Sequence, residues 1–179
     1  MGKTRVFLSL GSNLGQRKNN LEAAVARLAS LLEQIRVSAV YQTKPLYLAG
    51  QPEFLNIAVS AFSAAAPLRL LEGVLGIEAS LGRRRSGNVP KGPRIIDIDI
   101  LLYGERVLDH PRLAIPHPRM AERQFVLIPL LELAPELKDP LSGEPYAAML
   151  ARLEDQGVYT LCPWDYTACL SRDDRNAHA

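Results

Sequence analysis

The sequence predicts an α+β fold, a ferredoxin-like sandwich in which helices pack on an antiparallel sheet. Its 179 residues suit one globular domain with a short appendage. The expected elements follow the order strand, helix, strand, strand, helix, strand, which is the split βαβ pattern. Hydrophobic residues make up 47% of the chain, so a domain of this size can bury a core without disulfides or a structural metal.

The first three elements lie between residues 6 and 41. A short apolar run over residues 6–10 predicts a buried strand, which the turn residues Gly11, Ser12 and Asn13 end. We expect Asn13 to cap the helix that follows. That helix has one apolar stripe at spacings of three and four: Leu21, Val25, Leu28, Leu32 and Ile35. A second strand is expected over residues 36–41, and a loop with two prolines and a glycine over residues 43–52.

The next three elements begin with an alternating strand over residues 55–62. Its side chains face two ways: Leu55, Ile57, Val59 and Ala61 on one face, and Asn56, Ala58 and Ser60 on the other. Pro67 suits the first turn of a helix, and Gly82 suits its C-terminal end. We assign the inner face of this helix to Leu68, Leu71 and Leu75. A polar loop over residues 83–94 then leads into a strand over residues 95–102.

The remaining chain has weaker signals. We expect short extended pieces over residues 106–118 and a helix over residues 122–133 that Pro129 distorts. Turns over residues 140–145 and a weak helix over residues 146–153 precede a solvated tail. We therefore divide the chain into a main domain, residues 1–140, and a C-terminal extension, residues 141–179.

Composition excludes several classes of protein. No apolar run approaches the roughly 18 residues of a membrane span, and the N-terminal apolar stretch is too short for a signal peptide. We expect a cytoplasmic protein without a membrane partner. The two cysteines, Cys162 and Cys169, are then expected to be free thiols. The net charge of +2 does not by itself indicate a nucleic-acid partner.

Two aspartates stand on the strand expected over residues 95–102. Residues two apart on a strand face the same side, so Asp97 and Asp99 project together. Carboxylates about 6–7 Å apart repel each other and need either a cation between them or raised pKa values. Mg²⁺ takes one or two carboxylates and completes its shell with water and phosphate oxygens. From this strand alone, a metal site and a pair of solvated or salt-bridged acids both stay open.

The loop before this strand is cationic. Its basic residues are Arg83, Arg84, Arg85, Lys91 and Arg94, with no acidic residue among them. Arginines bind phosphate oxygens bidentately, so a cationic loop beside a diacid strand suits a polyphosphate with Mg²⁺. For Arg84 alone we favour a solvated position. The glycines and prolines make the loop irregular, and such a loop can close as a lid over bound phosphates.

His117 stands between two prolines and close to several arginines. Taken alone it is a packed or surface histidine, but beside a phosphate site it becomes a hydrogen-bond donor to phosphate. The GSNLG turn, residues 11–15, could meet an anion through backbone N–H groups, although we favour a sharp turn. No Walker A or protein-kinase motif is present, so a nucleotide would be bound by another construction.

The segments GPRIIDIDILLYG, IPHPRMAERQFVLIPLLELAPEL and YQTKPLYLAGQPEFLN closely resemble the 6-hydroxymethyl-7,8-dihydropterin pyrophosphokinase family, as does the GSNLG turn. The resemblance covers about residues 5–140 and implies a ferredoxin-like fold. It implies an ATP-dependent diphosphotransferase of folate biosynthesis. In that reaction the pterin hydroxymethyl oxygen attacks the β-phosphorus of ATP, pyrophosphate is transferred and AMP leaves. We accordingly expect two Mg²⁺ ions, small-molecule substrates, no nucleic-acid partner and a monomer.

The resemblance also implies roles for individual residues. Asp97 and Asp99 would bind Mg²⁺ and, with Arg83 and Arg94, form the catalytic set. The residues implied at the ATP site are Glu78, Arg83, Arg85, Lys91, Arg94, Ile100, Arg112, His117 and Arg123. Those implied at the pterin site are Thr43, Lys44, Leu46, Phe54, Asn56 and Phe125. Two phenyl rings can sandwich a flat ring, and an asparagine amide offers both a donor and an acceptor to a pterin edge.

The chain departs from the family at a few positions. Lys91 stands where many relatives carry tryptophan, and Lys44 stands where proline is frequent.

Three other classes of protein are alternatives to this interpretation. An RNA-binding module would present stacking aromatics on its sheet, which are few here. A metal-dependent nuclease or nucleotide hydrolase could use the same two aspartates. A non-catalytic paralogue would not need Asp97, Asp99 and Arg94 together.

Overall fold

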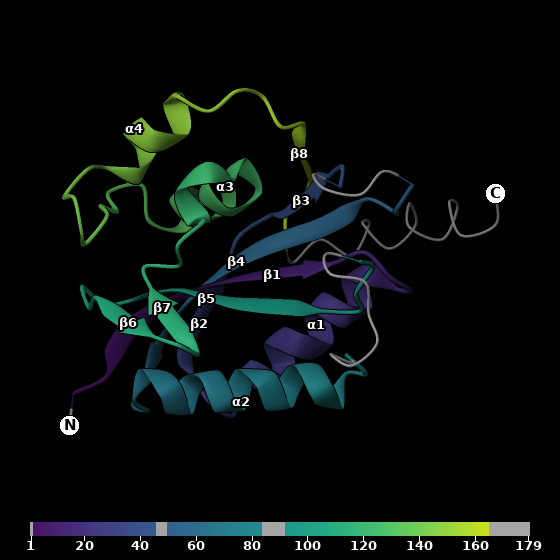
Figure 1. The fold of residues 1–179 in the computed structure, drawn as a ribbon. Coiled ribbons are helices and arrows are strands. Elements are labelled where there is room, and N and C mark those ends of the chain that lie inside the picture. The colour runs from purple at the N-terminus through teal and green to yellow at the C-terminus, as the bar shows by residue number, and fades with distance from the viewer. Residues whose placement is uncertain (1, 46–49, 84–91, 165–179) are drawn as a thin grey trace.

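The computed structural model describes residues 2–45, 50–83 and 92–164, and it has the ferredoxin-like arrangement of an antiparallel sheet with helices packed on it (Figure 1). The strands of the main sheet are β1 (Thr4–Ser12), β2 (Glu33–Val37), β3 (Val40–Thr43), β4 (Phe54–Ser63), β5 (Asp97–Tyr103) and β8 (Val158–Cys162). They form one six-stranded sheet in the order β5-β1-β4-β3-β8, with β2 also paired to β4. Every pairing in it is antiparallel. The predicted fold class is therefore confirmed.

The register of β1 with its two neighbours places the polar ends of three strands together. Gly11 of β1 lies opposite Asn56 of β4 on one side and opposite Asp97 of β5 on the other. One step along the same face, Ser9 lies opposite Asp99. Alternate residues of a strand share a face, so these side chains all project from the same side of the sheet.

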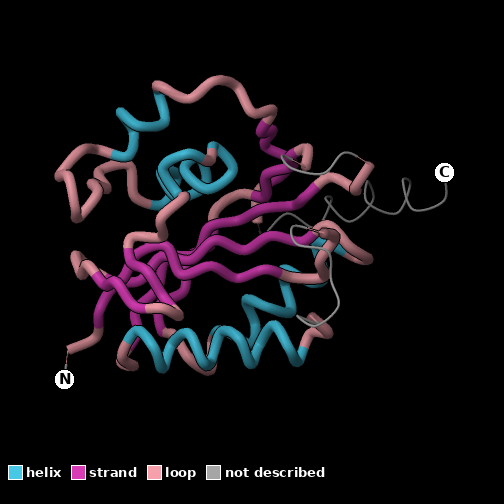
Figure 2. Tube along the Cα trace, viewed as in Figure 1, coloured by secondary structure: helices cyan, strands magenta, loops and turns pink. Residues whose placement is uncertain are grey.

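Two helices, α1 (Arg17–Leu28) and α2 (Pro67–Ser80), cover the opposite face (Figures 1 and 2). The predicted first helix is too long, because α1 ends at Leu28 and β2 begins at Glu33. Leu32 is nevertheless buried in the same core, since the chain turns back onto the sheet directly after the helix. The apolar spacing of three and four residues therefore continues past the end of α1, because Leu32 is buried although it is not helical.

The inner face of α2 also differs from the prediction. Its buried apolar side chains are Pro67, Leu70, Val74 and Ile77. Leu68, Leu71 and Leu75, which were assigned to the inner face, are only partly buried. This helix has apolar residues on more than one side, so only its contact with the sheet decides which side is innermost. The predicted start at Pro67 is confirmed, and Gly82 follows the helix at a φ of +93°.

The single strand expected over residues 36–41 is two strands. A short interruption at Ser38 separates β2 from β3, and both pair with β4. At the interruption, Ser38 N–H donates to Ala58 O at 3.0 Å, while Ala58 N–H donates to Ser38 Oγ at 2.9 Å. The serine hydroxyl therefore replaces a backbone acceptor where the regular ladder is broken.

The face of the sheet that bears Asn56 and Asp97 is covered farther along by α3 (Gln124–Leu133), a short 3₁₀ turn (Met120–Glu122) and α4 (Tyr146–Ala151). The expected helix over residues 122–133 is confirmed with Pro129 inside it, and the weak helix after residue 145 is confirmed as α4. The expected extended pieces are the hairpin of β6 (Leu108–His110) and β7 (Leu113–Ile115). Within the three described ranges, no helix has the length and hydropathy of a membrane span.

Strand β8 was not predicted. It pairs with β3 and adds an edge strand from the C-terminal extension to the main sheet. Its last residue, Cys162, is disulfide-bonded, so the expectation of two free thiols is wrong. That expectation rested on the predicted cellular location, and Cys169 lies outside the described residues. The boundary between residues 140 and 141 stays a prediction.

Candidate active site

A cavity of about 280 Å³ opens at the end of the sheet where β1 finishes and β4 and β5 begin. Its floor is the polar row of Ser9, Gly11, Asn56, Asp97 and Asp99. Glycine is favoured at position 11 because a Cβ there would lie only 3.0 Å from Asn56 Oδ1, whose amide would have to shift. The bare backbone of β1 therefore leaves space between the acidic and the amide sides of the cavity.

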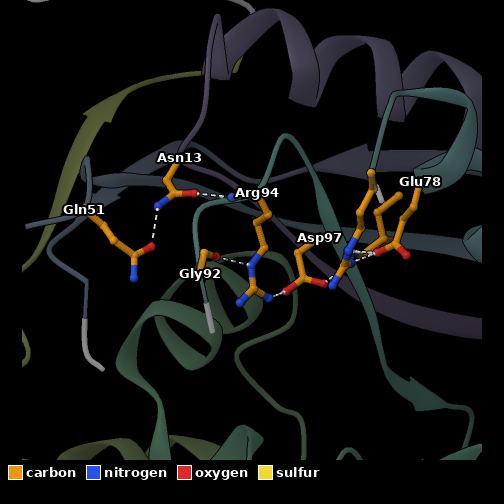
Figure 3. A network of polar contacts seen from close by, with 8 residues as sticks. Asn13, Gln51, Glu78, Gly92, Arg94 and Asp97 are labelled. Atoms are coloured by element: carbon orange, nitrogen blue, oxygen red, sulfur yellow. Dashed lines mark hydrogen bonds and ion pairs between the residues drawn. The ribbon is translucent and has the colours of Figure 1, made fainter. Parts of the chain in front are cut away.

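One side of the cavity holds a dense set of charges. Arg83 forms ion pairs with both Glu78 and Asp97, and Arg94 forms an ion pair with the other oxygen of Asp97. Figure 3 shows the guanidinium group of Arg94 against Asp97, and Arg83 donates to the other carboxylate oxygen of Asp97. Both arginines are mostly buried, so these pairs are more rigid than exposed salt bridges. Asp97 is thus the residue through which two predicted catalytic arginines are positioned.

Asp99 lies deeper in the same floor. Burial raises the pKa of Asp99, and the charge of the neighbouring Asp97 carboxylate adds to this effect, so that the pKa reaches about 6. A carboxyl group with this environment gains when a cation comes close. The sequence-based expectation that both aspartates share one face is confirmed by their shared place in the cavity.

The donor set fits a hard divalent cation that is only partly held by protein. Within the described part of the chain, no group of three or more His, Cys, Asp or Glu side chains is placed to hold a metal ion. Asp97 and Asp99 provide two carboxylates, and Mg²⁺ commonly takes that number and draws its other ligands from water and phosphate. Burial first and the charge of Asp97 second raise the pKa of Asp99, and a cation at this place would relieve both effects.

Glu78 has a supporting position. It is 1% exposed on the inner side of α2, where its Oε1 accepts a hydrogen bond from Ile98 N–H at 2.8 Å and pairs with Arg83. Its carboxylate therefore connects α2, the start of β5 and Arg83. It does not line the cavity.

The other side of the cavity is built from an amide and two rings. Asn56 is 3% exposed and donates through Nδ2 to Thr43 Oγ1 at 2.9 Å, which fixes the orientation of its amide. Phe54 and Phe125 contribute rings from β4 and α3, and Lys44 lies at the same wall. A fixed amide beside two aromatic side chains suits a flat heterocycle with hydrogen-bonding edges.

His117 and Arg123 complete the lining. Arg119 N–H donates to His117 Nδ1 at 3.3 Å, so Nε2 carries the hydrogen in the neutral ring. Burial lowers the pKa of His117, and the charge of Arg123 lowers it further. The guanidinium carbon of Arg123 lies 5.6 Å from the centre of the Phe125 ring, and Arg123 Nε is buried without a hydrogen-bond partner. Both side chains offer donors to an anion.

Some predicted site residues do not line the cavity, and Arg83 is one of them although it pairs with Asp97. Arg112 lies on the β6–β7 hairpin with its Nη1 3.8 Å from Glu72 of α2. Ile100 is buried in the core between the sheet and the helices α1 and α2. Leu46, Arg85 and Lys91, together with Arg84, lie outside the described residues.

Asn13 has another role than the predicted helix cap. Helix α1 has Gln16 at its N-cap position, with no side-chain capping bond. Asn13 instead exchanges hydrogen bonds with the backbone of Arg94 and donates to Gln51 Oε1 at 3.2 Å (Figure 3). Gln51, Pro45 and Ser9 line the cavity and were also missed. The GSNLG turn was the sequence signal for this region. It predicts a turn at Asn13 but not that Arg94 and Gln51 are its hydrogen-bond partners.

Three comparisons identify what the chain is similar to. The family model described as 7,8-dihydro-6-hydroxymethylpterin-pyrophosphokinase (HPPK) matches residues 7–135. The 2-amino-4-hydroxy-6-hydroxymethyldihydropteridine pyrophosphokinase of Pseudomonas aeruginosa is 41% identical over 159 residues, which cover 88% of this chain and 96% of that protein. The protein of the same name from Methylorubrum extorquens is 42% identical over 157 residues, covering 87% and 97%.

Longer proteins match as well. The folic acid synthesis protein fol1 of Pneumocystis carinii is 36% identical over 162 residues, and the chain spans only 22% of its length. The structure of wild-type Plasmodium falciparum HPPK-DHPS has a TM-score of 0.66 and 16% identity, covering 84% of this chain and 45% of that one. That likeness shows the fold. From the family model and the bacterial relatives it follows that the chain belongs to the 7,8-dihydro-6-hydroxymethylpterin-pyrophosphokinase family.

Proposed function

We propose that the protein transfers pyrophosphate from ATP to the hydroxymethyl group of 6-hydroxymethyl-7,8-dihydropterin and releases AMP, as a step of folate biosynthesis. One observation carries this proposal. A single cavity is lined by two aspartates and Arg94 on one side and by a fixed amide with two phenyl rings on the other, and Arg83 pairs with Asp97 outside the lining. Such a lining suits a charged polyphosphate beside a flat heterocycle. The pyrophosphokinases among the relatives are named for this chemistry.

On the acidic side, Asp97 and Asp99 would hold Mg²⁺, and the number of ions, two, is taken from the resemblance. When bound, Mg²⁺ neutralises phosphate charge and orients the phosphate oxygens. Arg83 and Arg94 add fixed positive charge next to these carboxylates. Both guanidinium groups are held beside the carboxylates, so they would supply positive charge close to the transferred group.

His117 and Arg123 extend the cationic lining toward the phosphates. The neutral His117 ring presents an Nε2 hydrogen, and the buried Arg123 Nε has a donor that an anion can satisfy. Arg85 and Lys91 from the loop, and Arg112 from the hairpin, are proposed to contact the nucleotide as the resemblance implies. Glu78 would act indirectly, because its carboxylate holds Arg83 in place.

On the other side, the pterin would lie with its ring near Phe54 and Phe125 and one edge on the Asn56 amide. Thr43 keeps that amide in one orientation, so the acceptor and the remaining donor are presented in a fixed pattern. Lys44 and Leu46 are proposed to complete this subsite. The hydroxymethyl group would then point toward the aspartates, where the β-phosphorus of ATP is held.

The chain contributes positioning and charge. Ser9 lines the cavity, but among the described residues no lining serine or cysteine is hydrogen-bonded to a histidine, so no covalent enzyme intermediate is proposed. Holding two substrates in line converts a reaction between separate molecules into one within a complex, which can lower the barrier by about 7–11 kcal/mol. Fixed positive charge at the transferred group supplies the rest.

The test is AMP release from ATP, followed by ³¹P NMR with and without 6-hydroxymethyl-7,8-dihydropterin and Mg²⁺. The proposal expects AMP and a pterin diphosphate only when all components are present. Production of ADP, or of AMP without pterin, would instead indicate a nucleotide hydrolase. A gel-shift assay with mixed RNA tests the RNA-binding alternative. The monomeric state and the cytoplasmic location stay predictions.

A further inference from the structure

The C-terminal extension passes the N-terminus of α3 between α4 and β8, and Gln156 holds it there by hydrogen bonds. Gln124 N–H donates to Gln156 Oε1 at 2.9 Å, and Gln156 N–H donates to Gln124 Oε1 at 2.9 Å. Gln156 Nε2 also donates to Glu122 O at 2.9 Å. The two glutamines therefore form a reciprocal clasp between segments 32 residues apart.

This clasp supplies what the helix itself lacks. The first N–H groups of a helix have no acceptor within the helix, and the N-cap residue of α3, Arg123, makes no side-chain capping bond. The Gln156 amide oxygen takes over that role at Gln124, the first residue of α3. A residue of the extension thus fixes the backbone at which α3 begins.

The residues on either side of Gln124 are Arg123 and Phe125, and both line the cavity. Their side chains leave the backbone at the clasped turn. A shift of that turn would move the Phe125 ring and the Arg123 guanidinium together, since the two already lie against each other at 5.6 Å.

The next two residues of the extension reach a second wall on the same side of the cavity, at Thr43. Gly157 turns the chain at a φ of +66°, with its N–H bonded to Asp155 Oδ1 at 2.8 Å. Val158 then lies opposite Thr43 in the pairing of β8 with β3. Thr43 is the residue that orients the Asn56 amide.

We propose that residues 156–158 form a strap that sets the distance between two walls on the same side of the cavity, the Phe125 wall and the Thr43–Asn56 wall, with Gln156 as its positioning residue. The ligand between these walls is the pterin, a point that rests on the proposed function. Gln156 lies beyond residues 7–135, which the family model matches. The extension is then a part of the pterin subsite that acts without touching the ligand.

The main test is Gln156→Ala. We expect the Kd for the pterin to rise about fivefold or more, as loss of hydrogen bonds of ordinary strength would produce. The Kd for a non-hydrolysable ATP analogue with Mg²⁺ should rise less than the Kd for the pterin, because Arg123 lies at the clasped turn but Asp97, Asp99 and Arg94 come from other segments. Gln124→Ala removes the acceptor of the Gln156 N–H, and the double variant should lose less pterin affinity than the sum of the two single losses, because the bonds of one clasp depend on one another.

A control and an independent readout separate positioning from general damage. Arg152→Ala removes a 2.6 Å ion pair with Glu144 in the same extension and should leave both Kd values unchanged. Amide hydrogen exchange should become faster in Gln156→Ala at residues 123–127 and 41–43, whatever ligand the cavity takes.

Each outcome decides the proposal. Selective loss of pterin affinity with faster exchange at both walls supports the strap. Unchanged pterin affinity, or equal weakening of pterin and nucleotide, overturns it. If the unaltered protein binds no pterin, the proposed function fails instead, and the exchange data still decide: faster exchange at both walls supports the strap, and unchanged exchange overturns it.

Discussion

Asn13 and Arg94 are joined by two hydrogen bonds: Asn13 N–H donates to Arg94 O at 3.1 Å, and Arg94 N–H donates to Asn13 Oδ1 at 2.7 Å. The side chain of Asn13 is 1% exposed and also donates to Pro52 O at 3.3 Å. The end of β1 is thereby tied to the loop before β4 and to the loop before β5. Arg94 receives a fixed backbone, from which its guanidinium reaches Asp97.

Replacing Asn13 by alanine should therefore affect both stability and turnover. The Arg94 N–H would lose its acceptor, which should cost about 2 kcal/mol in the free energy of unfolding. A small displacement of Arg94 should lower kcat by roughly 10- to 100-fold. Urea unfolding and steady-state kinetics measure the two effects. Asn19→Ala is the matched control, since Asn19 is an exposed asparagine with a local bond to Gln16. Equal effects of the two variants would refute the role of Asn13.

Arg94→Ala should reduce kcat by about 10²- to 10³-fold, the usual effect of removing one preorganised donor to a developing charge. The fold should survive, because Arg94 is part of the cavity wall and not of either hydrophobic core. Single-turnover rates and circular dichroism check these points. Arg69→Ala, which removes an exposed pair with Glu72 on α2, should have normal kinetics. An active Arg94→Ala enzyme would remove Arg94 from the catalytic set.

Asp99→Asn should separate stability from activity. The pKa of Asp99 is raised to about 6, so its charged form is disfavoured in the folded, metal-free protein. Ionised Asp99 therefore costs stability above pH 6, and the cost disappears as the pH falls below the ordinary value of 3.8. In the presence of a chelator, the variant should be more stable by about 2 kcal/mol at pH 7.5 and no more stable near pH 3.5.

The same Asp99→Asn variant should lose most of its activity and its binding of Mg²⁺–nucleotide, because one of two carboxylates is gone. Thermal unfolding across pH, combined with calorimetric titration of Mg²⁺–ATP, gives both results. A variant that is destabilised at pH 7.5, or that binds Mg²⁺–nucleotide normally, would contradict the assignment.

Asn56→Ala should raise the KM for the pterin by about tenfold or more while the KM for ATP changes little, because a site built to hydrogen-bond a substrate edge depends on that pairing. Its Thr43 partner would also lose a donor. Ser60→Ala is a suitable control, since Ser60 is buried on the same face of β4 but bonds to Arg5 outside the cavity. Substrate-dependent initial rates distinguish the two, and an equal rise in both KM values would argue against a pterin contact.

Much of the fold follows from periodicity that is local to each element. The alternation around Ile57 and the pair Asp97 and Asp99 could be assigned to faces without any tertiary contact, because side chains on a strand alternate with a fixed period of two. Helix faces were less certain. The predicted inner face of α2 was wrong by one residue, because this helix has apolar residues on several sides and only packing on the sheet decides which side is buried.

The site itself is divided in the same way. The sequence by itself determined the residue types and their order: the acidic pair, the basic loop before it and the GSNLG turn. Only the tertiary structure decided that Asn13 holds Arg94, that Glu78 holds Arg83 and that Gln156 clasps α3. The physical reason is distance along the chain. Asn13 and Arg94 are 81 residues apart, and whether such groups meet depends on how separate loops pack, which no local period encodes.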